Sequence, residues 1–380
     1  MQFQSKLPNV GTTIFTVMSR LANEAGAINL SQGFPDFDCA EKLQQAAAKY
    51  IKTGYNQYAP MTGVPLLRQR IAEKIKVMYG TQIDPDDEIT VTAGATQAIY
   101  TYISAFIRPG DEVILLEPAY DSYRPSVEVN GGVPIAYNLR APDYRPDWSV
   151  IADLISDRTK MLILNTPHNP TGTTLTADDF AALEKLTAGT DILILSDEVY
   201  EHLVFDGKKN ESVLSYPNLY RRSIAVYSFG KTLHATGWKL GYAVGPPELM
   251  REFRKVHQFN VFCVNAPLQH AIADFLAEPE EYLSLPDFYQ AKRDFFAEQM
   301  RGSGLRPLPC AGTYFQLFDY SDISDEPDTE FAKRMTTEYG VAAIPVSVFY
   351  ADGYDARVVR LCFAKTEETL ARAGAILRRV

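Results

Sequence analysis

The chain has 380 residues, and Asp and Glu outnumber Lys and Arg by 47 to 37. Its length suits two domains, and a net charge of −10 without a basic block argues against nucleic acid or an anionic membrane surface as the main partner. Hydrophobic residues make up 46% of the chain and charged residues 22%, which is close to the globular average and excludes a mainly disordered chain.

The sequence gives no sign of a membrane-bound or disulfide-rich protein. No stretch approaches the roughly 18 consecutive apolar residues of a membrane span, and the N-terminus lacks the apolar run of a signal peptide. The cysteines lie far apart and form no C-x-x-C motif: they are Cys39, Cys263, Cys310 and Cys362. We therefore expect no disulfide framework, no structural zinc site and a cytoplasmic location.

Between about residues 88 and 245, short β-rich runs alternate with helical stretches. The runs cover residues 88–92, 112–116, 133–137, 160–164, 192–195, 224–227 and 240–244. Several are apolar throughout, as in strands that are buried on both faces of a parallel sheet. Between two of them, Thr176 predicts a helix N-cap, with Asp179 in the first turn. The pattern predicts an α/β fold with helical crossovers between mainly parallel strands.

The pattern changes after residue 245, where helical runs dominate to about residue 300. Further elements are then expected as a strand at 313–318, a helix at 328–339, short strands at 341–344 and 358–362, and a last helix from Glu367. This order predicts a second, α+β domain. Residues 1–40 look rich in loops, and we expect them to pack with this second domain.

Polar and aromatic residues follow the predicted strands, at the edge of the sheet where ligands of open α/β sheets bind. Five strands bring to this edge a glycine turn, aromatic rings, an amide, a carboxylate with a phenol, and a lysine. These are Gly94 with Ala95 and Thr96, Tyr120 with Tyr123, Asn169, Asp197 with Tyr200, and Lys231 with Ser228. Such a convergent set suits an aromatic, phosphorylated cofactor that carries a carbonyl group.

Each of these residues also has an ordinary structural explanation. The Gly94 turn can simply join a strand to a helix, and Tyr120 can be a core aromatic. Asp197 can cap a helix, although a buried carboxylate needs a cation or a hydrogen-bond donor. Lys231 is either a solvated surface lysine or a Schiff-base lysine, whose pKa burial and a nearby cation such as Lys239 would lower.

Other site chemistries fit the sequence poorly. Gly230, Lys231 and Thr232 resemble the end of a P-loop, but the glycine that such a loop needs five positions before Gly230 is Ala225 here. The sequence contains neither an H-E-x-x-H zinc motif nor a G-x-S-x-G nucleophile motif. We therefore expect no metal site and no serine nucleophile.

In their order and spacing, these motifs resemble those of the fold-type-I pyridoxal-phosphate (PLP) aminotransferases of classes I and II. The resemblance covers nearly the whole chain, through residues 30–37, 56–63, the strand-end residues, 228–242 and 359–363. Within this family the chain is most similar to the methionine, glutamine-K and kynurenine transaminases. No single motif carries the resemblance; their combination does.

The resemblance implies a fold and an assembly. A large PLP-binding domain over residues 41–275 would hold a mainly parallel seven-stranded sheet flanked by helices. Residues 276–380 would form a smaller α+β domain, against which residues 1–40 pack. A homodimer with shared active sites is implied, because Tyr58 would reach the phosphate in the neighbouring subunit.

The resemblance also assigns cofactor roles. Lys231 would hold PLP covalently and then move the reacting proton, and Asp197 would pair with the pyridinium nitrogen. Tyr200 and Asn169 would hydrogen-bond to the phenolic oxygen of the ring, and Tyr120 would stack on the ring. The phosphate would be held by Gly94, Ala95, Thr96, Ser228 and Lys239. Many relatives carry arginine at the position of Lys239, and lysine supplies the charge without the planar fork.

Substrate roles follow from the same resemblance. Arg360 would bind the α-carboxylate in a fork, aided by Asn169 and the backbone of Gly33. The pocket for the substrate side chain would have an apolar, aromatic wall made of Phe15, Phe34, Tyr58, Tyr120 and Tyr123. Such a wall favours methionine, aromatic amino acids, kynurenine or neutral glutamine over aspartate. We predict an aminotransferase that moves an amino group from such a donor to a 2-oxo acid by a ping-pong mechanism.

Two other functions remain open from the sequence. A PLP-dependent β-lyase acting on cysteine conjugates would use the same residues and differ in whether a group leaves from the substrate's Cβ. A non-catalytic regulator with an aminotransferase-like domain is disfavoured by the acidic charge and by the short segment before residue 30.

Overall fold

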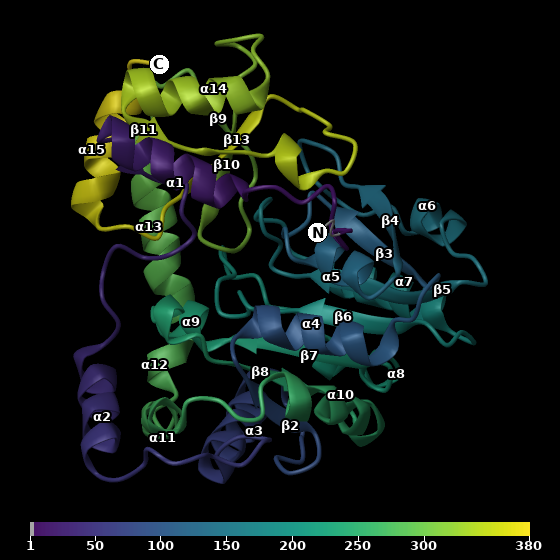
Figure 1. The fold of residues 1–380 in the computed structure, drawn as a ribbon. Coiled ribbons are helices and arrows are strands. Elements are labelled where there is room, and N and C mark those ends of the chain that lie inside the picture. Colours follow the sequence, from purple (N-terminus) through teal and green to yellow (C-terminus); the bar gives the residue numbers. More distant parts are fainter. Residues whose placement is uncertain (1–3) are drawn as a thin grey trace.

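A seven-stranded sheet forms the centre of the larger part of the molecule (Figure 1). The computed structural model describes residues 4–380. The spatial order of the strands is β2-β8-β7-β6-β5-β3-β4. They are β2 (Ile89–Thr92), β3 (Glu112–Glu117), β4 (Val133–Asn138), β5 (Thr159–Asn165), β6 (Leu193–Asp197), β7 (Ser223–Ser228) and β8 (Gly241–Val244). Among these strands β8 alone runs in the direction opposite to the others, so the predicted mainly parallel sheet is confirmed.

The central strands bury both of their faces. In β3, Val113 and Leu115 lie in one hydrophobic core, while Ile114 and Leu116 lie in the other. All four side chains are buried, which explains why this run of the sequence is apolar without alternation. At the edge of the sheet, β4 is less covered, and its Val133 is exposed.

Helices cover both faces of the sheet (Figure 1). Residues of α4 (Ala95–Phe106) and α10 (Pro247–Asn260) share the core of Val113, whereas residues of α3 (Pro65–Tyr79) and α7 (Ala177–Thr187) belong to the core on the opposite face. The chain also forms α2 (Glu41–Lys52), α5 (Tyr123–Val129), α6 (Trp148–Asp153), α8 (Pro217–Tyr220), α9 (Phe229–Thr232) and α11 (Ala266–Phe275). The helical crossovers predicted from the sequence are confirmed.

The smaller part of the molecule is built around a sheet of order β12-β13-β10-β9. Its strands are β9 (Arg306–Pro307), β10 (Phe315–Asp319), β12 (Ile344–Pro345) and β13 (Val358–Cys362), and the helices of this region are α12 (Glu280–Leu283), α13 (Leu285–Gln299), α14 (Asp328–Arg334) and α15 (Glu367–Leu377). The helix predicted at 328–339 is α14 followed by a turn of π-helix over Met335–Tyr339.

The N-terminal segment lies against this smaller part (Figure 1). β1 (Ile28–Asn29) pairs in parallel with β11 (Val341–Ala342), and α1 (Ile14–Ala25) packs on both strands. Where one domain ends and the next begins stays a prediction. Within residues 4–380, no helix is both long and apolar enough to cross a membrane.

Residues 4–40 are mostly loops and turns, as expected from the sequence, but they also contain α1, a helix of 12 residues that was not predicted. The Thr13 hydroxyl caps it by accepting a hydrogen bond from the Thr16 amide, and Met18 and Ala22, one turn apart, are buried. The part of the expectation that concerns residues 1–3 lies outside the described residues.

The start of α7 shows the capping predicted at Thr176. The Thr176 hydroxyl accepts from the Asp179 amide at 3.4 Å, and the Asp179 carboxylate accepts from the Thr176 amide at 2.7 Å. Arg145 and Trp148 also donate to this carboxylate. The reciprocal pair satisfies two backbone donors that the helix itself leaves free.

We expect Thr176→Ala to lower the free energy of unfolding by about 1 kcal/mol, because the Asp179 amide loses its acceptor. Urea denaturation followed by circular dichroism measures this change. Asp178→Ala, at an exposed position in the same turn, is the matched control and should cost about 0.3 kcal/mol through the helix dipole alone. Equal losses in the two variants would contradict the capping role.

Candidate functional site

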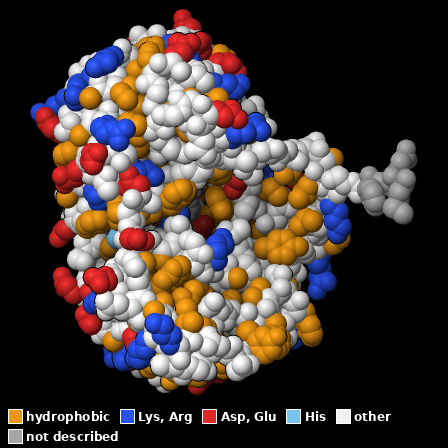
Figure 2. Space-filling view, turned by 60° about the vertical axis from the view of Figure 1, so that its left-hand side comes forward, with side chains coloured by type: hydrophobic (Ala, Val, Ile, Leu, Met, Phe, Trp, Pro, Cys, Tyr) orange, Lys and Arg blue, Asp and Glu red, His pale blue; other side chains and the backbone are white. Residues whose placement is uncertain are grey.

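A cavity of about 240 Å³ lies at the carboxyl ends of the parallel strands. Figure 2 shows a hollow in one face of the molecule, with hydrophobic side chains around it. Most of the predicted site residues line the cavity: Phe15, Gly33, Gly94, Ala95, Thr96, Tyr120, Asn169, Asp197, Tyr200, Ser228, Lys231, Lys239 and Arg360. The structure therefore brings together residues that are far apart in the sequence.

Lys231 lies in the short helix α9, just past the end of β7, and is partly buried between the two parts of the molecule. Its Nζ donates to the carbonyl oxygen of Gly33 at 3.0 Å and to the hydroxyl of Tyr314 at 2.6 Å. Burial lowers the pKa of Lys231 to about 8, and the charges of Arg360 and Lys239 act in the same direction. A neutral, nucleophilic amine is therefore accessible near neutral pH.

Asp197 ends β6 and is buried at the floor of the site. One carboxylate oxygen accepts from the Tyr123 hydroxyl at 2.6 Å, and the other accepts from the Val199 amide at 3.3 Å. Burial raises the pKa of Asp197 to about 6, although these hydrogen bonds and the charge of Lys231 oppose the shift. A cation placed against this carboxylate would lower its raised pKa and would be bound by it.

An anion-binding cradle lies at the start of α4. Gly94 has a φ of +78°, which turns the chain sharply into the helix that begins at Ala95. A Cβ on Gly94 would lie 3.7 Å from the Nζ of Lys239, so this ammonium lies over the first turn of the helix. Free backbone N–H groups, the helix dipole and a lysine together favour a phosphate at this point.

Arg360 is fully buried in β13, although it is the largest charged side chain of the site. Its Nη1 donates to Oδ1 of Asn169 at 2.7 Å and its Nη2 to the carbonyl oxygen of Ser31 at 3.1 Å. The guanidinium carbon lies 3.8 Å from the ring centre of Phe315. Within the described part of the chain, Arg360 has no ion pair and its Nε has no hydrogen-bond partner. Burial lowers its pKa to about 10.

This donor set fits PLP together with an amino acid. The Lys231 amine suits the aldehyde of the cofactor, and the Asp197 carboxylate suits its ring nitrogen. The anion cradle at the start of α4 suits the phosphate, and the aromatic ring of Tyr120 suits the face of the cofactor ring. The unpartnered Nε of the buried Arg360 is what a substrate carboxylate would satisfy. Among residues 4–380, no cluster of His, Cys, Asp or Glu could hold a metal ion.

Three predicted site residues lie outside the cavity wall. Tyr58 is 81% exposed, and its ring packs against Phe262. Phe34 is 43% exposed, although its carbonyl oxygen accepts from Lys365. Tyr123 is buried behind Asp197 and donates to it. Its expected place in the substrate pocket is therefore wrong, because its hydroxyl is the donor that a buried carboxylate needs.

Sequence reasoning gave no role to several residues of the site, among them Asn165, Tyr314 and Phe315. Asn165 ends β5, where its Nδ2 donates to the backbone oxygen of Asp197 at 2.9 Å and its Oδ1 accepts from the Asn169 amide at 2.8 Å. Its place directly after an apolar run was a usable signal. Tyr314, which binds Lys231, carries no such signal, because it comes from the smaller part of the molecule, directly before β10.

Comparisons with known proteins agree with this geometry. Residues 25–377 match the family model for aminotransferases of class I and II. Methionine aminotransferase of Escherichia coli (strain K12) is 54% identical over 99% of this chain and 98% of its own length. A probable N-succinyldiaminopimelate aminotransferase of Mycobacterium tuberculosis is 37% identical over 97% and 96%. The fold matches the crystal structure of YbdL from Escherichia coli, identified as a methionine aminotransferase, with a TM-score of 0.98, 54% identity and full coverage of both chains.

We expect Tyr123→Phe to weaken PLP binding about tenfold, because Asp197 loses a charge-assisted hydrogen bond worth roughly 1.5 kcal/mol. The dissociation constant is measured from the visible absorbance of the bound cofactor. Tyr102→Phe is the matched control, since Tyr102 is equally buried and its hydroxyl has no partner among the described residues. Unchanged affinity in Tyr123→Phe would contradict a supporting role for this hydroxyl.

Proposed function

Because this chain belongs to the aminotransferases of class I and II, we propose that its preferred amino donor is a neutral, apolar L-amino acid, methionine first. The chain is a PLP-dependent aminotransferase, which passes the amino group of the donor to a 2-oxo acid in two half-reactions at one site. The observation that carries the donor proposal is a buried, unpaired Arg360 in a cavity whose wall includes Phe15, Tyr120, Tyr200 and Phe315 and holds no further cation for a second carboxylate beyond Lys231 and Lys239 among the described residues.

When bound, PLP supplies an aldehyde that takes up the amino group and a ring that draws electrons away from the substrate's Cα. We assign the proton transfer to Lys231, whose lowered pKa leaves a neutral amine to take a proton from Cα and return it. Asp197 would supply the negative charge that keeps the ring nitrogen protonated. Tyr200 and Asn169 would donate to the phenolic oxygen of the ring, and Tyr120 would cover its face.

We assign the substrate's α-carboxylate to Arg360. The guanidinium is already oriented by Asn169, Ser31 and the ring of Phe315, so little ordering is needed on binding. Its remaining donors include the unpartnered Nε. A carboxylate held there presents the Cα of the substrate to the interior of the cavity that the Lys231 amine lines.

The side-chain preference rests on charge. Within the described wall of the cavity the cations are Lys231, Lys239 and Arg360, and each already has a partner in the scheme above. A second carboxylate on the substrate would be left without a cation against Phe15 and Phe315, which is costly in a desolvated site. The 54% identical relative named a methionine aminotransferase supports the same choice.

The β-lyase and the regulator considered from the sequence receive no support from the relatives, which are aminotransferases. The substrates of an aminotransferase are small molecules. The cytoplasmic location expected from the sequence stays a prediction.

We also propose that the enzyme is a homodimer with shared sites. Tyr58, Phe259 and Phe262 form an exposed aromatic cluster, with exposed fractions of 81%, 92% and 50%, and the rings of Tyr58 and Phe262 are 5.1 Å apart. Large apolar side chains gathered on a surface favour burial against a partner. A second copy that covers this cluster would receive Tyr58 at its own site, as the resemblance implies.

Methionine and aromatic donors should react at least tenfold faster than aspartate, because aspartate would bury an unpaired carboxylate. The measurement is the loss of the cofactor's visible absorbance in single-turnover reactions with a panel of amino acids. Lys231→Ala serves as the inactive control and should give no turnover with any donor while keeping its circular dichroism spectrum. Aspartate reacting as fast as methionine would refute the donor proposal.

Mixed dimers test the shared site. Lys231→Ala and Tyr58→Ala should each be impaired alone, whereas mixing the two should recover activity. In the mixed dimer, one site combines the intact Lys231 of one chain with the intact Tyr58 of the other. Sedimentation of the unmixed protein should give twice the 42.5 kDa mass of one chain. A monomer, or no recovery on mixing, would overturn the proposal.

A further inference from the structure

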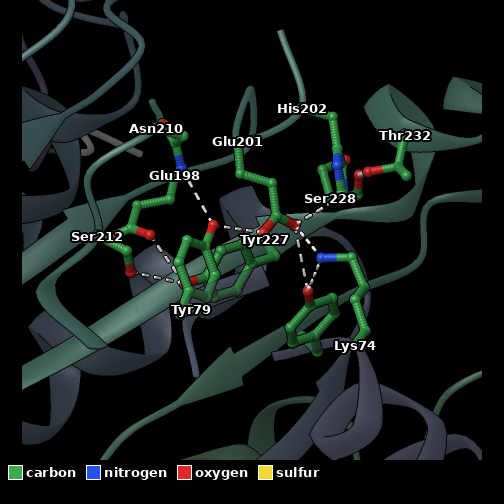
Figure 3. Close-up of polar contacts among 11 residues, drawn as sticks. Lys74, Tyr79, Glu198, Glu201, His202, Asn210, Ser212, Tyr227, Ser228 and Thr232 are labelled. Atoms are coloured by element: carbon green, nitrogen blue, oxygen red, sulfur yellow. Dashed lines mark hydrogen bonds and ion pairs between the residues drawn. The ribbon is translucent and has the colours of Figure 1, made fainter. Parts of the chain in front are cut away.

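The turn after β6 sends its side chains to two different places. Asp197 and Tyr200 line the cavity, whereas Glu198 and Glu201 enter a buried polar cluster (Figure 3). The buried polar cluster consists of Lys74, Tyr79, Glu198, Glu201, Ser212, Tyr227 and Tyr242. None of its side chains has a part in the scheme above, yet two of its carboxylates belong to the same turn as the cofactor residues.

An ion pair lies at the centre of the buried polar cluster. The Nζ of Lys74 lies 2.5 Å from Oε1 of Glu201, and the two side chains are 1% and 2% exposed. Tyr79 donates to the other oxygen of Glu201 at 2.8 Å, and Lys74 also donates to the Tyr242 hydroxyl at 3.1 Å. Burial raises the pKa of Glu201, but the charges of Lys74 and His202 and the hydrogen bonds from Lys74 and Tyr79 together outweigh this effect and lower the pKa below its usual value.

Glu198 holds the same turn through neutral donors. Its carboxylate accepts from the Ser196 hydroxyl at 2.8 Å, the Val213 amide at 3.1 Å and the Tyr227 hydroxyl at 2.8 Å. Within residues 4–380, no ion pair reaches Glu198. Lys74 is therefore the cation that ties this turn to another element, helix α3, which is 127 residues away in the sequence from Glu201.

A buried ion pair does little for stability, because well-packed apolar residues of similar volume serve as well or better. The ion pair instead restricts orientation, because an ammonium and a carboxylate that must be in contact allow few relative positions of the elements that carry them. Asp197, Tyr200 and Glu201 lie in one short turn of the chain. A shift of the Glu201 carboxylate would therefore also move Asp197 and Tyr200. The neighbouring core residue Ile75 is equally buried, but its apolar contacts do not require one particular orientation.

We propose that Lys74 and Glu201 are positioning residues of the transamination site. Their ion pair fixes the turn 197–201 so that Asp197 and Tyr200 point into the cavity. This inference rests on the proposed roles of Asp197 and Tyr200.

The test compares three variants of the holoenzyme: Lys74→Met, Lys74→Met with Glu201→Gln, and the control Ile75→Val. For each, the rate of PLP loss after dilution is followed by visible absorbance, the melting temperature is taken at a fixed excess of PLP, and kcat and KM are measured with methionine. We expect Lys74→Met to release PLP at least tenfold faster and to lower kcat more than it changes KM.

The double variant distinguishes a change in the position of the turn 197–201 from a loss of the protein's thermal stability. Glu201→Gln removes the stranded charge, so the melting temperature should recover toward that of the unaltered protein, while the fast release of PLP persists. Ile75→Val should lower the melting temperature and leave the release rate unchanged. A release rate that follows the melting temperature through all three variants would overturn the proposal, because the cluster would then be structural only.

Two further variants keep the test decisive. If Lys74→Met yields no folded holoenzyme, Tyr79→Phe removes one hydrogen bond to Glu201 and keeps the ring; it should release PLP several-fold faster, and unchanged release would overturn the proposal. Asp197→Ala is run alongside. If it retains PLP like the unaltered protein, the role of Asp197 itself fails; if it loses PLP while the Lys74 variants do not, only the positioning inference fails.

Discussion

The rest of the structure depends on three charged groups that line one cavity and are wholly or partly removed from water. Asp197 and Arg360 are buried and Lys231 is partly buried, and burial shifts the pKa of each group in the direction that favours its neutral form. Such groups cost free energy in a folded chain unless something compensates them. An amino acid and a phosphorylated cofactor with a ring nitrogen carry the complementary charges, so the site is most favourable when it is filled.

The sheet explains how these groups come to share one cavity. β5 and β6 are parallel and in register, so Asn165 and Asp197 end side by side, and β7 ends next to them at Ser228. Parallel strands therefore deliver an amide, a carboxylate and a lysine to one edge without any special arrangement of loops. Arg360 comes instead from the antiparallel sheet of the smaller part.

The two parts of the molecule meet at Lys231. Its amine binds Gly33 from the N-terminal segment and Tyr314, the residue before β10 of the smaller part, while its backbone belongs to the larger part. On the far side of the Asp197 turn, the buried polar cluster ties the same edge to α3. The cofactor residues thus lie between contacts from three separate stretches of chain.

The strands, the capped helix α7 and the strand-end residues could be predicted from the sequence. Each depends on residues that are close together in the chain, such as an apolar run or the motif around Lys231. Helix α1 was not predicted, because its buried Met18 and Ala22 give only a short helical signal. Tertiary structure alone decided that Tyr123 supports Asp197, that Tyr314 holds Lys231, and that Lys74 reaches Glu201. The last two contacts span 83 and 127 residues, and which of many polar side chains meet across such a distance is set by how the sheets and helices pack, which no local pattern encodes.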